Sequence, residues 1–296
     1  MIEGKWRFQA IAALATLTFL LGCLVVWELY STLIVEKRPV PLRIRQAGIV
    51  AVPKIVARPK AGFIPPKAGF IPFRRMVRVA IILDDAGGNF VDYNDIFSID
   101  APLTISVLPN MPGSLRIVDR ARASGKEAIL HLPMEPINGV YVRHDGSMVL
   151  TSMNDDSIKG VVTRDLATVP GVVGVNNHMG SKATEDPRVM DDVLSVIKEK
   201  GLFFVDSRTA HDSVAYDRAK AEGVRAAKNV IFLDVFQSEE AVEKKIGELV
   251  EMARQNGGAI GIGHATRINT VTALMRMIPE YKKQGVEFVF ASALVK

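Results

Sequence analysis

Cysteine is nearly absent from this sequence, which has only Cys23 among its 296 residues. A chain with one cysteine forms no internal disulfide and no zinc site built from cysteines. Proteins without disulfides occur in every compartment, so this scarcity does not indicate where the protein resides. Any zinc site must therefore draw on carboxylate oxygens and on the nitrogens of the five histidines.

Excess basic charge is missing from most of the chain, although the formal net charge is +5. Residues 1–76 hold 12 Lys/Arg against 3 Asp/Glu, whereas residues 77–296 hold 25 Lys/Arg against 29 Asp/Glu. A nucleic-acid-binding domain normally carries its basic patch on the folded part of the chain. We therefore predict no nucleic-acid partner.

Charge is absent altogether from residues 8–27, which are mostly Ala, Leu, Val, Ile and Phe. A helix of this length, rising about 1.5 Å per residue, spans a bilayer core of about 30 Å. Trp6 and Trp27 stand at its two ends, as interfacial aromatic residues do. We predict that residues 1–30 anchor the chain in the inner (cytoplasmic) membrane with a single pass. A cleaved signal peptide and a lipoprotein signal around Cys23 are the alternatives.

Acidic residues are also scarce in residues 31–76, where Glu36 is the only one among ten Lys/Arg and seven prolines. The motif KAGFIP occurs there twice, at residues 60–65 and 67–72. Such a composition cannot bury a core and predicts an extended spacer between the anchor and the fold. A basic arm that lies on anionic lipid or cell-wall polymer is the alternative.

Residues 77–296 alternate short apolar runs with amphipathic segments, which predicts an α/β fold. The runs are apolar throughout, as in parallel strands buried on both faces. Seven or eight β-then-α units predict an irregular (β/α) barrel, and a doubly wound open sheet is the alternative. Asp186-Pro187 and Ser238 carry the start signals of two helices, and residues 141–150 predict an inserted hairpin. The candidate strands are Val77–Leu83, Leu103–Leu108, Glu127–Leu132, Val172–Asn176, Leu202–Asp206, Val224–Ala226, Ala259–Gly263 and Val286–Phe290.

Most of the chemically interesting side chains follow the predicted strands at the point where each strand ends. In a β/α barrel these ends converge on one face, where the active site lies. Residues far apart in the sequence are therefore expected to become neighbours. These residues are Asp84, Asp85, His131, Glu135, Asn176, Asn177, His178, Asp206, Arg208 and His264.

Three of these side chains form a candidate metal site. Asp85, His131 and His178 supply one carboxylate and two imidazoles, a ligand set that suits a divalent metal, most readily Zn²⁺. Three protein ligands leave a position open for water, whose pKa the metal would lower. Each of these residues also has a structural interpretation, because an Asp-Asp pair can cap a helix and a loop histidine can be satisfied by hydrogen bonds.

Three further residues are candidates for acid–base catalysis. Asp84 is placed to accept the proton of the attacking water, and His264 to protonate the leaving amine or to stabilise the oxyanion. Asp206 is expected to orient His264 and to hold it charged. Glu135 is a candidate for substrate binding, with bracing of the His131 loop as its structural alternative.

Five motifs stand at the predicted strand ends: Leu83-Asp84-Asp85-Ala86-Gly87, His131-Leu-Pro-Met-Glu-Pro136, Asn176-Asn-His-Met-Gly-Ser181, Phe204-Val-Asp-Ser-Arg-Thr209 and Gly261-Ile-Gly-His264. Together they resemble the divergent polysaccharide deacetylase family, over roughly residues 77–295. That family belongs to the NodB-like carbohydrate esterases, and the resemblance implies an irregular, often seven-stranded barrel that hydrolyses N-acetyl groups of amino sugars with a metal, usually zinc. It also implies a glycan substrate, with Asp84 as the base, Asp85 as a metal ligand and His264 as the acid.

The sequence departs from the standard members of that superfamily at two points. His131 is followed four residues later by Glu135 rather than by a second metal-binding histidine, so His178 is assigned that role. The arginine-rich proline motif is missing, and Arg208 is its predicted substitute. With Glu135 and Asn177, Arg208 completes the predicted substrate-binding set.

The side of the membrane that holds the barrel is predicted differently by two arguments. Lys and Arg residues follow the apolar run, and the positive-inside rule would then keep the barrel in the cytoplasm. The family resemblance implies the periplasmic or extracytoplasmic side, which is our prediction.

Three functions remain open on the sequence alone. The first is a metal-dependent hydrolase that removes acetyl groups from an amino-sugar-containing envelope polysaccharide. The second is a non-catalytic carbohydrate- or metal-binding envelope protein with the same fold. The third is a metal-independent glycoside hydrolase that acts through Glu135 and Asp206.

Overall fold

The computed structural model describes residues 76–88, 93–139 and 146–296. The predicted anchor at residues 1–30, and the linker except for Met76, lie outside the described residues. Within the part that is described, no helix is both long and apolar enough to cross a bilayer. Residues 141–145, half of the hairpin predicted at 141–150, likewise lie outside the described residues.

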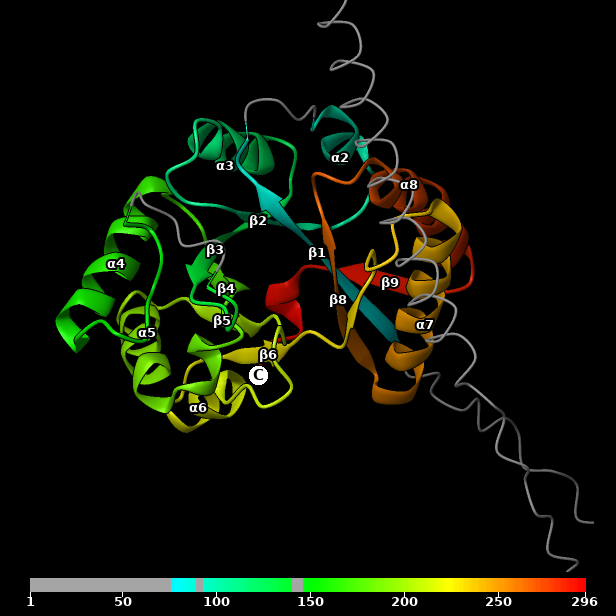
Figure 1. Cartoon of the computed structure of the whole chain (residues 1–296). Coiled ribbons are helices and arrows are strands. Elements are labelled where there is room, and N and C mark those ends of the chain that lie inside the picture. Colours follow the sequence, from blue (N-terminus) through cyan, green and yellow to red (C-terminus); the bar gives the residue numbers. More distant parts are fainter. Residues whose placement is uncertain (1–75, 89–92, 140–145) are drawn as a thin grey trace, which may run out of the picture. The chain divides into compact units, whose positions relative to one another are not determined.

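A sheet of nine strands, paired in parallel throughout the described residues, forms the centre of the fold (Figure 1). Its order is β6-β5-β4-β3-β2-β1-β8-β7, and β9 pairs with β1 outside this path. The α/β prediction is therefore confirmed, in the form of a parallel half-barrel. The strands are β1 (Val77–Ala86), β2 (Thr104–Val107), β3 (Glu127–Met134), β4 (Gly174–Met179), β5 (Phe203–Asp206), β6 (Ala226–Lys228), β7 (Ile231–Phe232), β8 (Gly258–His264) and β9 (Val286–Val289).

The half-barrel does not close by strand pairing, because β6 and β7 stand at the two ends of the sheet order. Only Asn229 and Val230 separate these strands, whereas parallel neighbours need a crossover of about a dozen residues. The backbone of Lys296 pairs with β6 instead, through two hydrogen bonds to Ala226 of 3.0 and 3.1 Å. The sixth predicted strand lies two residues early, and the two-residue β7 was not predicted.

Helices follow the strands and pack on the outside of the sheet (Figure 1). Two predicted helix starts are confirmed: the Asp186 carboxylate accepts N–H bonds from Arg188 and Val189, and the Ser238 hydroxyl accepts one from Ala241. These caps satisfy backbone donors that a helix leaves unpaired. The helices are α2 (Asn94–Ser98), α3 (Ser114–Ala123), α4 (Asp155–Thr168), α5 (Pro187–Glu199), α6 (Ala215–Ala221), α7 (Glu239–Asn256) and α8 (Ile268–Lys283), with 3-10 turns at Ala183–Glu185 and Ala291–Ala293.

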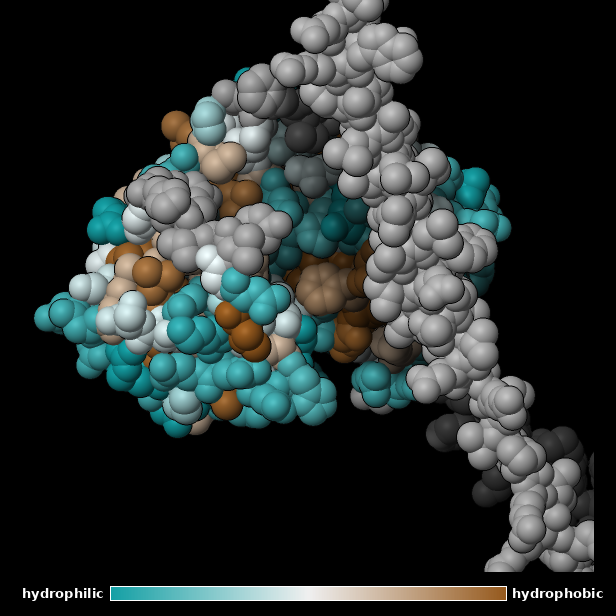
Figure 2. Space-filling view, in the orientation of Figure 1, coloured by the Kyte–Doolittle hydropathy of each residue, from teal (hydrophilic) through white to brown (hydrophobic). Residues whose placement is uncertain are grey.

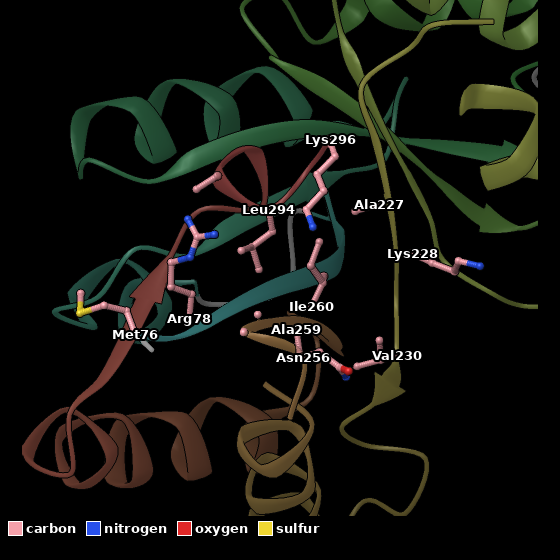
Figure 3. Close-up of a pocket in the computed structure, with 13 residues that line it drawn as sticks. Met76, Arg78, Ala227, Lys228, Val230, Asn256, Ala259, Ile260, Leu294 and Lys296 are labelled. Carbon is pink, nitrogen blue, oxygen red and sulfur yellow. The ribbon is translucent and has the colours of Figure 1, made fainter. Parts of the chain in front are cut away.

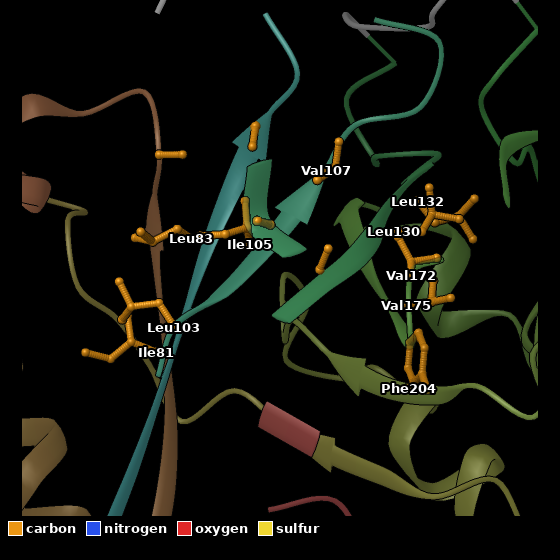
Figure 4. Close-up of a cluster of buried hydrophobic side chains, with 14 of the residues drawn as sticks. Ile81, Leu83, Leu103, Ile105, Val107, Leu130, Leu132, Val172, Val175 and Phe204 are labelled. Atoms are coloured by element: carbon orange, nitrogen blue, oxygen red, sulfur yellow. The ribbon is translucent and has the colours of Figure 1, made fainter. Parts of the chain in front are cut away.

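Alternate strand residues enter two separate cores, because successive side chains of a strand point to opposite faces. The outer core lies between the sheet and the helices and includes Leu83, Leu130 and Phe204 (Figure 4). The inner core lies inside the half-barrel and is built on Ala80, Ile82, Ile129, Phe203, Val205, Ile260, Ile262 and Ala291.

This alternation determines which polar side chains face the interior of the half-barrel. Asp84 follows inward-facing Ile82 by two residues, and His131 and His264 follow Ile129 and Ile262 in the same way. The carboxyl ends of β1, β3 and β8 therefore direct these three side chains toward one another.

A cavity of about 520 Å³ lies at the opposite ends of β1 and β8 (Figure 3). Its lining includes Arg78, Ala227, Ile260 and Leu294 and none of the predicted site residues. Figure 2 shows a hollow with hydrophobic residues in it between the two halves of the half-barrel. The cavity therefore belongs to the unclosed side of the sheet and not to the chemical site.

Candidate functional site

The three residues predicted as metal ligands lie together, Asp85 and His178 near the carboxyl ends of β1 and β4 and His131 in the carboxyl half of β3. Their potential ligand atoms all lie within 4.8 Å of one another. Asp85 Oδ1 is 3.2 Å from His131 Nε2 and 3.0 Å from His178 Nδ1. The two nitrogens are 3.1 Å apart, and the rings meet edge to face with an interplanar angle of 72°.

The donor set of this cluster fits a divalent cation. Asp85 Oδ1 is buried and accepts no hydrogen bond, although buried carboxylate oxygens are normally paired. Burial raises the pKa of the Asp85 carboxyl, but the two neighbouring imidazoles outweigh burial and lower it far below its usual value. An ionised carboxylate beside two imidazole nitrogens is a common ligand set for zinc and related metals.

Asp85 reaches this cluster because its backbone is unusual. Its φ angle is +62°, in the left-handed region that non-glycine residues rarely adopt. In a regular strand Asp85 would point away from the face that Asp84 occupies. The left-handed turn at the end of β1 lets both carboxylates reach the site.

Asp84 is buried, with 3% of its surface exposed, and its Oδ2 lies 3.6 Å from His131 Nε2. Burial raises the pKa of the Asp84 carboxyl, and the opposing effects of His131 and of a hydrogen bond from Asn176 do not cancel this. A raised pKa makes Asp84 a stronger base than an exposed aspartate, as general-base catalysis near neutral pH requires.

His264 lies on the other side of the cluster, with Nε2 3.9 Å from Asp85 Oδ2. Its Nδ1 is 2.8 Å from Oδ1 of Asp234, which is 1% exposed. Burial lowers the pKa of His264, but the hydrogen bond and charge of Asp234 outweigh burial and raise it. Asp234 Oδ2 also accepts the backbone N–H of His264 at 2.8 Å and the Thr270 hydroxyl at 2.7 Å.

Asp206 does not hold His264, contrary to the sequence prediction. Val205 faces the inner core, so Asp206 points to the opposite face of β5. There its carboxylate accepts bonds of 2.8 Å from the Arg208 backbone N–H and from the Ser213 hydroxyl. Asp234 was missed because the strand before it, β7, has only two residues.

Glu135 braces its own loop. Its Oε2 accepts the backbone N–H and the hydroxyl of Thr151 at 2.6 and 2.7 Å, and its Oε1 pairs with Lys182 Nζ at 2.7 Å. Burial raises the pKa of Glu135, but these donors outweigh burial and lower it. The bracing alternative therefore describes its contacts, and a part in substrate binding stays a prediction.

Asn177 and Arg208 also bind the protein's own backbone. Asn177 accepts the Ser207 N–H at 2.9 Å and donates to the Met179 carbonyl at 2.7 Å. Arg208 donates to the His211 carbonyl at 3.0 Å. The structure does not bring these two side chains into contact with the cluster of Asp85 and the two histidines through any described bond.

Asn176 is a site residue to which the sequence analysis assigned no role. Its Oδ1 lies 2.8 Å from His131 Nδ1, and its Nδ2 donates to Asp84 Oδ1 at 2.9 Å. A carboxamide oxygen can only accept, so Nδ1 of His131 carries a proton. Nε2 of His131 faces Asp85 and His178, where it can bind a cation once it is free of its own proton. The available signal was position, because Asn176 precedes His178 by two residues on one strand.

Comparison with known proteins gives one family and several relatives. A family model described as divergent polysaccharide deacetylase matches residues 81–295. An uncharacterised protein of Haemophilus influenzae is 34% identical over 206 residues, which cover 69% of this chain and 72% of that protein. The uncharacterised Escherichia coli protein YibQ is 31% identical over 201 residues, which are 68% of this chain but only 62% of YibQ.

Among solved structures, a crystal structure of an uncharacterised Agrobacterium tumefaciens protein superimposes with a TM-score of 0.71. It is 26% identical in sequence, and the match covers 75% of this chain and 90% of that one. The half-barrel is therefore shared with a protein whose fold was determined by experiment.

Proposed function

Because the chain belongs to the divergent polysaccharide deacetylase family, we propose that it is a metal-dependent hydrolase that removes acetyl groups from an amino-sugar-containing envelope polysaccharide. The observation that carries this proposal is the convergence of Asp85, His131 and His178 between a buried carboxylate, Asp84, and a paired imidazole, His264. A metal site flanked by a base and an acid matches what amide hydrolysis requires.

Asp85, His131 and His178 would hold the cation, for which we propose Zn²⁺ on the basis of their nitrogen and oxygen donors. A bound cation supplies a water of lowered pKa and polarises the acetyl carbonyl. Three protein ligands leave room for that water in the coordination shell.

Asp84 and His264 move the protons of the reaction. Asp84 accepts a proton from the water as the water oxygen bonds to the acetyl carbon. His264 then gives a proton to the sugar nitrogen as the C–N bond breaks, which yields acetate and a free amine. Asp234 holds His264 through Nδ1, which leaves Nε2 directed at the reaction centre and stabilises the protonated ring.

We also propose that residues 8–27 tether the protein to the inner membrane and that the half-barrel lies on the extracytoplasmic side. The uncharged run supports the tether, and an envelope glycan as substrate supports the orientation. Reporters active only on one side of the membrane, fused at the C-terminus, test this. Activity of the cytoplasmic reporter alone would refute the orientation.

Acetate release from N-acetylglucosamine oligomers tests the function. The full chain in detergent should release acetate, a chelator should stop the reaction, and added zinc should restore it. If the purified chain neither releases acetate nor binds zinc, the proposal is refuted. Zinc binding without acetate release would favour the non-catalytic envelope protein.

The glycoside hydrolase alternative is weakened by the surroundings of its two carboxylates. Glu135 is bonded to Thr151 and Lys182, and Asp206 is bonded to Ser213 and to the Arg208 backbone. Both carboxylates thus stabilise loops, and neither is directed by a described bond toward the other.

A further inference from the structure

A buried hydrogen-bond network connects the metal-binding side of the site with its base. Asn176, which is fully buried, stands at its centre and contacts both His131 and Asp84. The Ser106 hydroxyl on β2 donates to Asn176 Oδ1 at 2.5 Å and is also fully buried. Four strands, β1 to β4, therefore contribute one side chain each to a network closed to solvent.

The orientation of the Asn176 amide is determined by its neighbours. With Oδ1 toward His131 and Ser106, Nδ2 donates to the Asp84 carboxylate. The opposite orientation would place two oxygens, Oδ1 and Asp84 Oδ1, against each other. It would also force the proton of a neutral His131 onto Nε2, where it would point at the metal cluster.

We propose that Asn176 is a positioning residue that couples the metal ligand to the base, a role that rests on the proposed function. Its oxygen fixes His131 in the form with the proton on Nδ1, so that Nε2 can bind the cation. Its amide group holds the Asp84 carboxylate beside the same ring. Outer-shell partners of this kind commonly set metal affinity and ligand orientation.

A carboxamide is required because the two contacts need opposite chemistry at one side chain. Asp84 needs a donor and His131 Nδ1–H needs an acceptor, and a carboxylate or a leucine fails at least one of them. The neighbouring Asn177 cannot substitute, because it faces the other side of β4 and is bonded to Ser207 and Met179.

Two substitutions separate the two contacts. Asn176→Asp keeps an acceptor for His131 but removes the donor to Asp84 and adds a negative charge beside it. Asn176→Leu removes both. Asn256→Asp, on the exposed end of α7, changes the same charge far from the network and is the matched control.

Two measurements are central. The first is zinc affinity by chelator competition, and the second is the NMR signal of the His131 Nδ1–H proton in the zinc-loaded full chain. Asn176→Leu should weaken zinc binding about 10- to 100-fold and abolish the downfield proton signal. Asn176→Asp should keep zinc affinity within about threefold and keep the signal, but lower kcat for acetate release about 100-fold or more. The control should match the wild type in all three.

Wild-type zinc affinity with an unchanged downfield signal in Asn176→Leu would overturn the proposal. Equal weakening of zinc binding by Asn176→Asp and Asn176→Leu would also overturn it, because the carboxylate still accepts from His131. If Asn176→Leu does not fold, the Asp variant and Ser106→Ala provide the same test, the latter with a smaller loss of affinity. The zinc and NMR measurements need no substrate, so they remain decisive even if the wild type releases no acetate.

Discussion

Replacing Asp234 by asparagine should separate acid catalysis from metal binding. Both oxygens of Asp234 act as acceptors: Oδ1 faces His264 Nδ1, and Oδ2 faces the His264 backbone N–H and the Thr270 hydroxyl. Asparagine offers one acceptor oxygen, so its amide group must meet one of these donors. If the oxygen keeps the two bonds of Oδ2, the amide faces His264 Nδ1 and the ring must take its proton at Nε2.

The magnitude follows from what His264 is asked to do. A positioned general acid contributes about 10²- to 10⁴-fold, which corresponds to about 3–5 kcal/mol at 1.36 kcal/mol per decade. We expect Asp234→Asn to lower kcat for acetate release within that range, because the protonated ring loses its countercharge. Zinc affinity should stay within about twofold of wild type, because Asp234 contacts none of the three ligands.

The assay is acetate release at saturating substrate, with the zinc content measured on the same preparations. Loss of charged hydrogen bonds at a buried site should also cost about 1–3 kcal/mol of stability, so the assay temperature must lie below the unfolding transition of the variant. Asp191→Asn is the control, since Asp191 pairs with Arg218 at the surface between α5 and α6. A kcat within threefold of wild type, in folded and zinc-loaded Asp234→Asn, would refute the assignment of His264 and its partner.

Three other variants follow from the contacts of the site. Asp206→Asn should destabilise the fold by about 1–3 kcal/mol in urea unfolding but lower kcat far less than Asp234→Asn, and the reverse order would return Asp206 to the catalytic set. Asp85→Ala should reduce zinc from about one per chain to near zero by elemental analysis, and unchanged zinc would remove it from the ligands. Glu135→Gln should lose stability relative to wild type at neutral pH. The pKa of Glu135 in the folded protein lies below its ordinary value of 4.5. The stability difference between wild type and Glu135→Gln should therefore be present above pH 4.5 and shrink as the pH falls through the folded pKa. A stability difference that does not vary with pH would contradict the ion pair with Lys182.

Strand-end position predicted the cluster of Asp84, Asp85, His131, His178 and His264 because parallel strands deliver their carboxyl ends to one edge. This inference needs only the positions of the strand ends and the assumption that the strands share one sheet, and the short apolar runs predicted both. The helix caps were readable for a similar reason, since a cap is a local contact within three residues.

The residues that the sequence analysis misassigned or missed, Asp206 and Asp234, depend on contacts that are not local. Asp206 stands at a strand end like the others, but its face depends on the register of β5, which places Val205 inward. Asp234 follows a strand too short to show a pattern, and it meets His264 only because β7 pairs with β8. Strand β6 also pairs with a distant segment, through the two hydrogen bonds between Ala226 and Lys296, and no local sequence pattern predicts that contact.

The left-handed backbone of Asp85 costs the fold some stability, whereas the proposed metal site needs the side chain at that position. A residue with a side chain gives up about 1 kcal/mol to hold that conformation, and glycine would adopt it freely. Asp85→Gly should therefore resist heat better than Asp85→Ala, although both lack the ligand. The end of β1 therefore carries a side chain at a position where the backbone favours glycine, which is the kind of local strain expected where a side chain must reach a bound ion.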